Sequence, residues 1–156
     1  MGSATVADLR RFLEATGGLS FISIARVDGT VATSLVNSGI HDHPLSGAPC
    51  AAFVVRSDAR KLVHIRAGRK VTVSVHNRWD WVAATGSAQI FGPDDPLPGD
   101  PVDGFDTAPV PALLRSVFQS AGGTHDDWDA YDRVMCEEHR AAVFVLLDRL
   151  YGTMRG

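Results

Sequence analysis

The sequence predicts a mainly β protein, a small antiparallel barrel with peripheral helices. Stretches in which apolar and polar residues alternate, such as VTVSVH (71–76), dominate the first ninety residues, and this alternation is typical of half-buried strands. A later stretch, AAVFVLLDRL (141–150), is apolar on both faces, as expected for a strand in the middle of a sheet or barrel. The 156 residues, of which 45% are hydrophobic and 21% charged, predict a single globular domain over residues 1–156.

An amphipathic helix is predicted within residues 1–18. The segment TVADLRRFLEATGG spaces its apolar residues along one helical face, and Thr5 is a suitable N-cap with Asp8 in the reciprocal position three residues later. Gly17 and Gly18 are typical of a helix end, because glycine adopts positive φ at little cost.

Six strands are predicted in the rest of the chain. The first two are joined as a hairpin at Asp28–Gly29, the dipeptide that best suits a two-residue turn. CAAFVV is the third strand, VTVSVH the fourth and WVAATGSAQIF the fifth, in which Gly86 is a candidate bulge. Residues 92–110, rich in Pro, Gly and Asp, are predicted to form a long loop, and residues 111–138 a helical insertion. The last barrel strand is predicted over residues 140–150.

The stretch RSDARKLVHIRAGRK (56–70) holds six of the chain's 15 Lys and Arg residues, although the formal net charge of the chain is −3. Ser57 and Gly68 are typical of the start and end of a short helix, which places Arg60 and Lys61 in its first turn. The helix dipole disfavours cations there, so their presence indicates an anion site, with phosphate as the natural occupant. A solvent-exposed helix face whose positive charge balances acidic residues elsewhere in the chain explains the same spacing equally well.

Aromatic and metal-ligating side chains occur in three short motifs. Trp79 and Trp81 alternate at the start of a strand and are predicted to point the same way, either into the core or as a platform for a planar ligand. HDH (41–43) and THDDWD (124–129) contain metal-ligating side chains, but a polar loop and helix capping by Thr124 explain them better. No metal site is therefore predicted.

Several functional classes are disfavoured. The sequence lacks the nucleophile elbow, the dinucleotide-binding glycine motif and the Walker loop. Its net acidity, and the absence of aromatic residues among the basic ones, argue against nucleic acid as a partner. The longest apolar run, 141–147, is far too short for a membrane span, and we expect a cytoplasmic protein with no membrane contact. Cys50 and Cys136 match no zinc or redox spacing and are expected to be reduced thiols.

The order of these elements, from Leu19 to Gly152, resembles the pyridoxamine-phosphate-oxidase-like split β-barrel family. Four stretches, ARKL, WDWVAATGSAQIFGPDDP, GGTHDDWDAYDRVM and HRAAVFVLLDRLYG, are similar to its actinobacterial branch, which uses the deazaflavin coenzyme F-420. The resemblance implies an FMN-binding-protein-like homodimer of six-stranded split barrels, with two cofactor sites at the subunit interface. It implies an oxidoreductase that passes a hydride from reduced F-420 to a small organic substrate such as an enone, a quinone or a tetrapyrrole.

The resemblance also implies which residues hold the cofactor. No side chain is an evident general acid, so no catalytic residue is predicted. Arg66 extends the cationic groove toward the carboxylate tail that F-420 has and FMN lacks. Two other functions remain open, an FMN-dependent oxidase or reductase of the same fold and a non-catalytic flavin- or haem-binding protein. The remaining implied residues are Arg56, Ser57, Arg60 and Lys61 at the phosphate, Leu35, Val36 and Asn37 beside the ring, and Trp79 and Trp81 from the partner chain.

Overall fold

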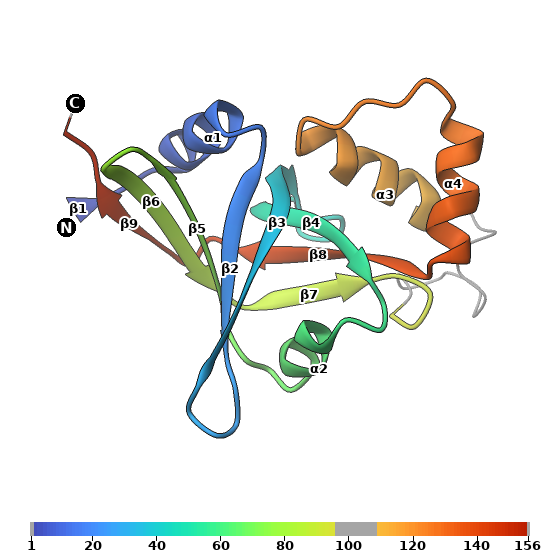
Figure 1. Cartoon of the computed structure of the whole chain (residues 1–156), viewed down its shortest axis with the longest axis horizontal. Helices are drawn as coiled ribbons and strands as arrows, with labels where there is room; N and C mark the ends of the chain where they lie inside the picture. The colour runs from blue at the N-terminus through green and yellow to red at the C-terminus, as the bar shows by residue number, and fades with distance from the viewer. Residues whose placement is uncertain (1, 96–108, 156) are drawn as a thin grey trace.

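The computed structural model describes residues 2–95 and 109–155, and this part of the chain is mainly β with four helices (Figure 1). Within it, nine strands form one antiparallel sheet in the order β1-β9-β6-β5-β2-β3-β4-β8-β7, which does not close on itself. The strands are β1 (Gly2–Ser3), β2 (Leu19–Ala25), β3 (Val31–Asp42), β4 (Pro49–Arg56), β5 (Val71–Asn77), β6 (Asp80–Gly86), β7 (Ala88–Phe91), β8 (Arg140–Leu146) and β9 (Arg149–Thr153). The helices are α1 (Val6–Ala15), α2 (Arg60–Arg66), α3 (Pro109–Ser120) and α4 (Trp128–Glu137).

The described sheet has nine strands where six were predicted, mainly because two predicted strands are each divided. The fifth is interrupted at Ser87 and the sixth after Leu146, and the two interruptions adjoin, since the Leu146 N–H donates to the Ser87 carbonyl oxygen at 2.9 Å. Beyond them the pairing continues, β6 with β9 and β7 with β8. At Gly86 a Cβ would lie 1.8 Å from the Leu146 carbonyl oxygen, so this corner has room only for glycine. The short β1, paired with β9, is the remaining addition.

The predicted hairpin is present between β2 and β3, which are separated by five residues. The Arg26–Thr30 backbone hydrogen bond closes a loop of three residues, 27–29, where two were predicted. The Arg26 N–H donates to the Thr30 carbonyl oxygen at 2.8 Å, and the Gly29 N–H donates to the Arg26 carbonyl oxygen at 3.1 Å. Gly29 adopts φ 87°, which is the usual way for a three-residue hairpin loop to rejoin its strand. The twelve-residue β3 pairs with β2 over its first part and with β4 over its second.

The central strands β4 and β8 each contribute to two hydrophobic clusters. On one face of β8, Val143 and Val145 pack with Phe53 of β4 inside the barrel. On the other face, Ala142 and Phe144 pack against α3 and α4. The expectation of a closing strand that is apolar on both faces is therefore confirmed.

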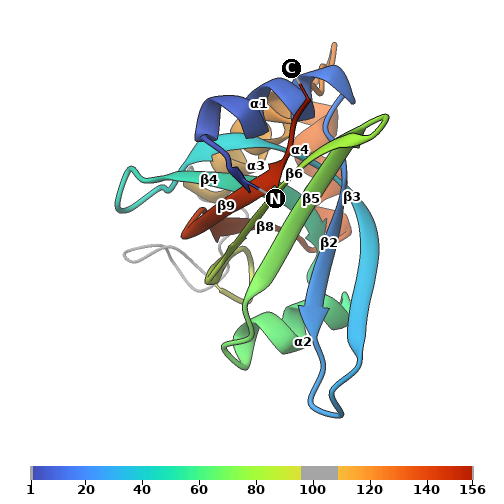
Figure 2. The ribbon, with the colours of Figure 1, turned by 90° about the vertical axis from the view of Figure 1, so that its left-hand side faces the viewer.

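α1 and α2 lie at opposite ends of the barrel (Figures 1 and 2). The capping box that begins α1 is confirmed, because the Asp8 N–H donates to the Thr5 hydroxyl at 3.1 Å and the Thr5 N–H donates to the Asp8 carboxylate at 2.9 Å. The helix buries Leu9, Phe12 and Leu13 in a third cluster, against β5 and β6.

The prediction that Ser57 caps the next helix is wrong. α2 is seven residues long, with Ala59 at its N-cap position and no side-chain cap. The Ser57 hydroxyl instead donates to the His139 carbonyl oxygen, to which the Ser57 N–H also donates at 2.8 Å. This partner is present because His139 precedes β8, the strand that pairs with β4. Gly68, at φ 83°, follows the end of the helix as predicted.

α3 and α4 form the predicted helical insertion, with a different cap on α4. Asp127 caps that helix through a hydrogen bond from the Ala130 N–H at 3.1 Å, so the assignment of this role to Thr124 was wrong. Most of the predicted 92–110 loop, residues 96–108, lies outside the described residues. In residues 2–95 and 109–155, no helix is both long and apolar enough to cross a bilayer.

Candidate functional site

Five of the residues implied by the resemblance line one cavity of about 410 Å³. β3 contributes consecutive residues to its wall, β4 contributes its final residue, and α2 contributes the second residue of its first turn. The wall also includes Val54 and Val55 of β4 and Arg140 of β8. The five residues are Leu35, Val36, Asn37, Arg56 and Lys61.

Three cationic side chains and one acidic side chain, that of Asp58, line this cavity, which we call the cationic cavity. Arg56 and Arg140 are directly opposed in the β4–β8 ladder. Each is paired locally, Arg56 with Asp58 (Nε–Oδ1 3.4 Å) and Arg140 with Glu138 (Nη2–Oε2 2.6 Å). Like charges directly opposed across strands are unfavourable, so this arrangement favours an anion between them.

Lys61 is the third cation, and its environment differs from that of the two arginines. Its side chain is half-buried, and burial lowers the pKa of the Lys61 ammonium group. Among the described residues, no carboxylate lies within ion-pairing distance of it. A desolvated cation that faces a cavity, with no carboxylate partner in the described part of the chain, is suited to a bound phosphate.

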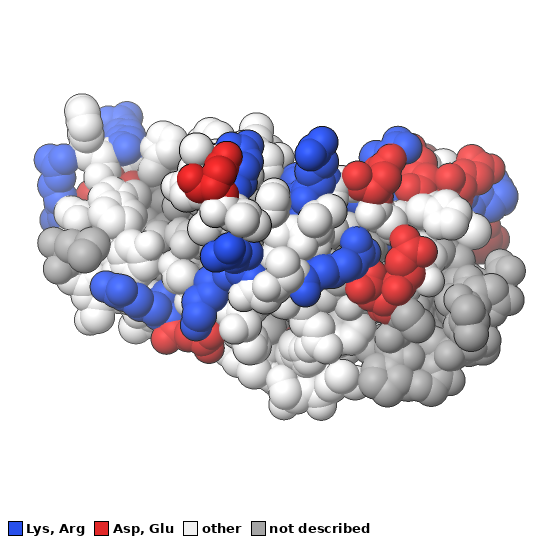
Figure 3. Space-filling model, turned by 90° about the horizontal axis from the view of Figure 1, so that it is seen from below, with Lys and Arg blue, Asp and Glu red and all other residues white. Residues whose placement is uncertain are grey.

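Three other residues of the basic stretch do not line the cationic cavity. Arg60 is exposed, and Ser57 lines a neighbouring cavity that also includes Glu137. The Arg66 guanidinium forms two hydrogen bonds with the Asp95 carboxylate, at 2.6 and 3.2 Å. The face that carries α2 shows basic side chains across its middle, flanked by acidic ones (Figure 3).

The two tryptophans differ in position and also lie outside this cavity. Trp79 belongs to the two-residue turn between β5 and β6 and is 78% exposed, so strand alternation does not apply to it. Trp81 lies on β6, with its ring edge against Tyr151 at a centroid distance of 5.9 Å. Neither ring lines the cavity of its own chain.

A second, apolar cavity of about 260 Å³, which was not predicted from the sequence, lies beside the first, and we call it the helical pocket. Phe118 of α3, with Tyr131 and Met135 of α4, forms its outer wall. Its inner wall includes Asn37, Val54 and Arg140, which the cationic cavity shares. The sequence predicted a helical insertion over residues 111–138, but not that a cavity remains between these helices and the sheet.

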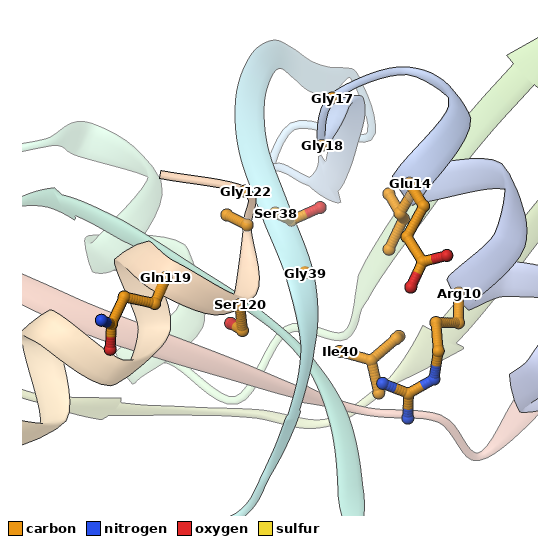
Figure 4. A pocket seen from close by; sticks show the side chains of 12 residues that line it. Arg10, Glu14, Gly17, Gly18, Ser38, Gly39, Ile40, Gln119, Ser120 and Gly122 are labelled. Atoms are coloured by element: carbon orange, nitrogen blue, oxygen red, sulfur yellow. The ribbon is translucent and has the colours of Figure 1, made fainter. Parts of the chain in front are cut away.

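A further cavity of about 300 Å³ lies between α1, β3 and the C-terminal end of α3, and the resemblance implies none of its residues (Figure 4). Arg10 and Glu14 extend from α1 along one side of it. Gly18 and Gly39 permit the close packing that forms it, since a Cβ at Gly39 would lie 2.0 Å from the Ser120 carbonyl oxygen.

One face of the sheet carries large apolar side chains that are exposed to solvent. Leu19 and Phe21 of β2 and Leu35 of β3 are 53%, 45% and 57% exposed, and Phe21 is directly opposite Leu35. Leu35 also lines the cationic cavity, so the exposed apolar face continues to the rim of that cavity. Contiguous exposed apolar groups are typical of a protein interface.

Comparison with solved structures identifies the fold. A conserved hypothetical protein from Mycobacterium tuberculosis, Rv2991, superposes with a TM-score of 0.66 at 14% identity, over 97% of this chain and 85% of that one. A pyridoxamine 5'-phosphate oxidase-related, FMN-binding protein from Nostoc punctiforme gives 0.59 at 11% identity, over 97% and 83%. A protein described as an F420 reductase gives 0.53 at 15% identity, over 85% and 88%. No protein-family model and no curated protein sequence matches the chain.

Two of these neighbours, the FMN-binding protein and the F420 reductase, match the family that the sequence resembles. At such identities the likeness shows the fold, which is the split barrel of FMN-binding proteins. The fold brings β3, the end of β4 and the start of α2 to one cavity, which the sequence alone did not establish. Arg140 joins them through the β4–β8 ladder.

Proposed function

We propose that the protein is an oxidoreductase that binds a flavin or deazaflavin in the cationic cavity. The observation that carries the proposal is Lys61, a partly desolvated ammonium group without an anionic partner among the described residues, at the cavity that three β3 residues also line. Lys61 and Arg56 would hold the phosphate. Leu35, Val36 and Asn37 would lie along the ring system, together with Val54 of the neighbouring strand β4.

The residues present fit such a cofactor in their chemistry. Apolar side chains of β3 and β4 suit a planar ring, and the cations at the α2 end suit its phosphate. When bound, the reduced cofactor supplies a hydride to an unsaturated or oxidised organic acceptor. The protein's own contribution is then to anchor the phosphate, orient the ring and keep one side of it accessible.

We propose F-420 as the cofactor, with FMN as the alternative. F-420 continues beyond its phosphodiester into a tail of carboxylates, which needs cations beyond the phosphate site. Arg69 and Lys70 are exposed just after α2 and can meet such a tail. Arg66 can join them only by giving up or sharing its ion pair with Asp95.

We also propose that the protein is a homodimer that pairs through the exposed apolar face of β2 and β3. Burial of Leu19, Phe21 and Leu35 against a second copy would remove these side chains from water. The interface would lie beside the cationic cavity, since Leu35 belongs to both. Trp79 and Trp81 would then reach the cofactor from the partner chain.

Fluorescence titrations of the purified protein with F-420 and with FMN test the cofactor proposal. We expect saturable, micromolar or tighter binding of F-420, weakened about tenfold in Lys61→Ala, because a charge-assisted hydrogen bond from a half-buried cation is lost. Lys61→Arg retains the charge, and Arg133→Ala removes an exposed charge from α4 as a matched control. Preference for FMN would replace F-420 in the proposal, and failure to bind either compound would overturn it.

A further inference from the structure

We infer that the helical pocket is the acceptor half of the proposed site, and that it takes a planar conjugated carbonyl compound of one or two rings but excludes a tetrapyrrole. The inference rests on the proposed function, because the cationic cavity supplies the cofactor half. It assigns a role to α3 and α4, the two helices packed on the outer side of β4 and β8.

The two cavities adjoin, because they share side chains on three strands. Asn37 of β3, Val54 of β4 and Arg140 of β8 line both. A ring held along β3 and β4 in the cationic cavity therefore has its open end beside the helical pocket. An acceptor in that pocket lies next to the cofactor without crossing the phosphate site.

The pocket walls favour a flat apolar molecule. Phe118 and Tyr131 pack together with a ring-centroid distance of 5.0 Å, and Met135 provides an adaptable thioether beside them. The Tyr131 hydroxyl donates to the Leu114 carbonyl oxygen at 3.2 Å, and burial raises the Tyr131 pKa to about 12. The hydroxyl is thus committed within the protein, and Tyr131 offers the pocket its ring.

Arg140 supplies the polar contact that a carbonyl acceptor needs. Its Nε–H donates a hydrogen bond to the Glu138 carboxylate at 2.7 Å, and its Nη2 forms an ion pair with the same carboxylate at 2.6 Å. Nη1 has no partner among the described residues. A guanidinium N–H at the junction of the two cavities can donate to the carbonyl oxygen of a quinone or enone. It then stabilises the negative charge that gathers on that oxygen when a hydride arrives.

The reaction balances with solvent as the only further reactant. The acceptor gains two electrons and one proton as a hydride from the reduced deazaflavin, which also releases one proton to solvent as it becomes oxidised. That proton replaces the one that the acceptor takes from water, so no water is consumed. A quinone takes its second proton from water and leaves as the hydroquinone. An enone forms a C–H bond at its β carbon, and its α carbon takes a proton from water.

The size of the helical pocket decides between the acceptors. Its volume of about 260 Å³ lies below the range of roughly 300–1,000 Å³ that is usual for sites of drug-sized ligands. One or two fused rings match such a volume, whereas the four pyrrole rings of a tetrapyrrole do not. The pocket therefore narrows the acceptors of the proposed function to enones and quinones.

Isothermal titration calorimetry of the full chain tests the inference without relying on turnover. The probes are 1,4-naphthoquinone, as a two-ring acceptor, and biliverdin, as a tetrapyrrole. Met135→Trp fills the pocket from its outer wall, and Met135→Leu nearly preserves its volume. We expect Met135→Trp to weaken naphthoquinone binding at least tenfold, Met135→Leu to stay within about threefold of the wild type, and F-420 affinity to be unchanged in both.

The possible outcomes separate this inference from the proposed function. Naphthoquinone binding that Met135→Trp leaves unchanged would overturn the pocket assignment while F-420 binding remains intact. Biliverdin binding as tight as naphthoquinone binding, and equally sensitive to Met135→Trp, would overturn the size argument. Failure of the wild type to bind F-420 or FMN would overturn the proposed function and, with it, the acceptor role. If Met135→Trp lowers the melting temperature strongly, Met135→Phe provides a smaller filling change.

Discussion

Arg56 and Arg140 are directly opposite each other at the end of the β4–β8 ladder, and both line the cationic cavity. Each has its own carboxylate, but the carboxylates differ in exposure, since the side chain of Asp58 is 76% exposed and that of Glu138 33%. Solvent screening weakens the first pair more than the second. Arg56 is therefore the more available of the two for a ligand's phosphate.

We predict that Arg56→Gln and Arg140→Gln have different effects. Arg56→Gln should weaken cofactor binding about threefold, the scale of an exposed ionic contact, and make that binding less sensitive to salt. Arg140→Gln should weaken naphthoquinone binding more than cofactor binding, because Arg140 faces the helical pocket as well. Titrations of each variant with both ligands, at low and high salt, measure the contrast. Equal effects on both ligands would contradict the separation of the two cavities.

The pH dependence of cofactor binding should follow Lys61. Burial lowers the pKa of this ammonium group in the free protein, so the folded state releases its proton at a lower pH than the unfolded state. Stability therefore rises with pH between the folded and unfolded pKa values of Lys61, where the unfolded state binds more protons. Phosphate binding requires the protonated form, so cofactor affinity should fall as pH rises through the folded pKa.

Fluorescence titrations across the alkaline range test this prediction, and Lys61→Arg is the matched control. Arginine stays protonated in proteins, so binding by Lys61→Arg should be flat where the wild type declines. A decline of the same size in both proteins would show that another group titrates.

The features that were predicted correctly from the sequence are those whose determinants are local. The Thr5–Asp8 capping box and the glycine of the β2–β3 hairpin depend on neighbours in the chain, and both are present. The helix cap predicted at Ser57 was wrong, because the carbonyl oxygen that accepts a hydrogen bond from the Ser57 hydroxyl belongs to His139, far away in sequence. Arg140 was missed as a site residue for the same reason, since only the β4–β8 register brings it opposite Arg56.

Division of the predicted strands was not visible in the sequence either. The break between β6 and β7 lies opposite the break between β8 and β9. β6 pairs with β9 on one side of the two breaks, and β7 pairs with β8 on the other. Gly86 was singled out as a bulge, and it marks the corner because a Cβ there would meet the Leu146 backbone.

Helix α4 provides a direct comparison between its predicted and observed caps. Asp127→Ala should lower the free energy of unfolding by about 1 kcal/mol, because the hydrogen bond to the Ala130 N–H is lost. Thr124→Ala should have little effect, since Thr124 is not the cap. Urea denaturation of the two variants measures the difference. A larger loss in Thr124→Ala would restore the sequence-based assignment.

The proposed homodimer can be tested at the apolar face of the sheet. Phe21→Glu places a charge opposite Leu35 and should convert a dimer to a monomer, because an unpaired buried carboxylate is costly. Val27→Glu is the matched control, since Val27 is an apolar residue of the hairpin loop and 81% exposed. Sedimentation velocity gives the oligomeric state. A monomeric wild type would overturn the homodimer, and a dimeric Phe21→Glu would exclude this face as the interface.

The sharing of β4 and β8 between two clusters affects how the protein opens. Detachment of α3 and α4 would expose Ala142 and Phe144 to water while Val143 and Val145 remained inside the barrel. The helical pair can thus separate as a unit without dissolving the sheet, and its amides should exchange with deuterium sooner than those of β4 and β8. Such partial opening would let an acceptor of one or two rings reach the helical pocket while the strand residues that line the cationic cavity stayed in the sheet.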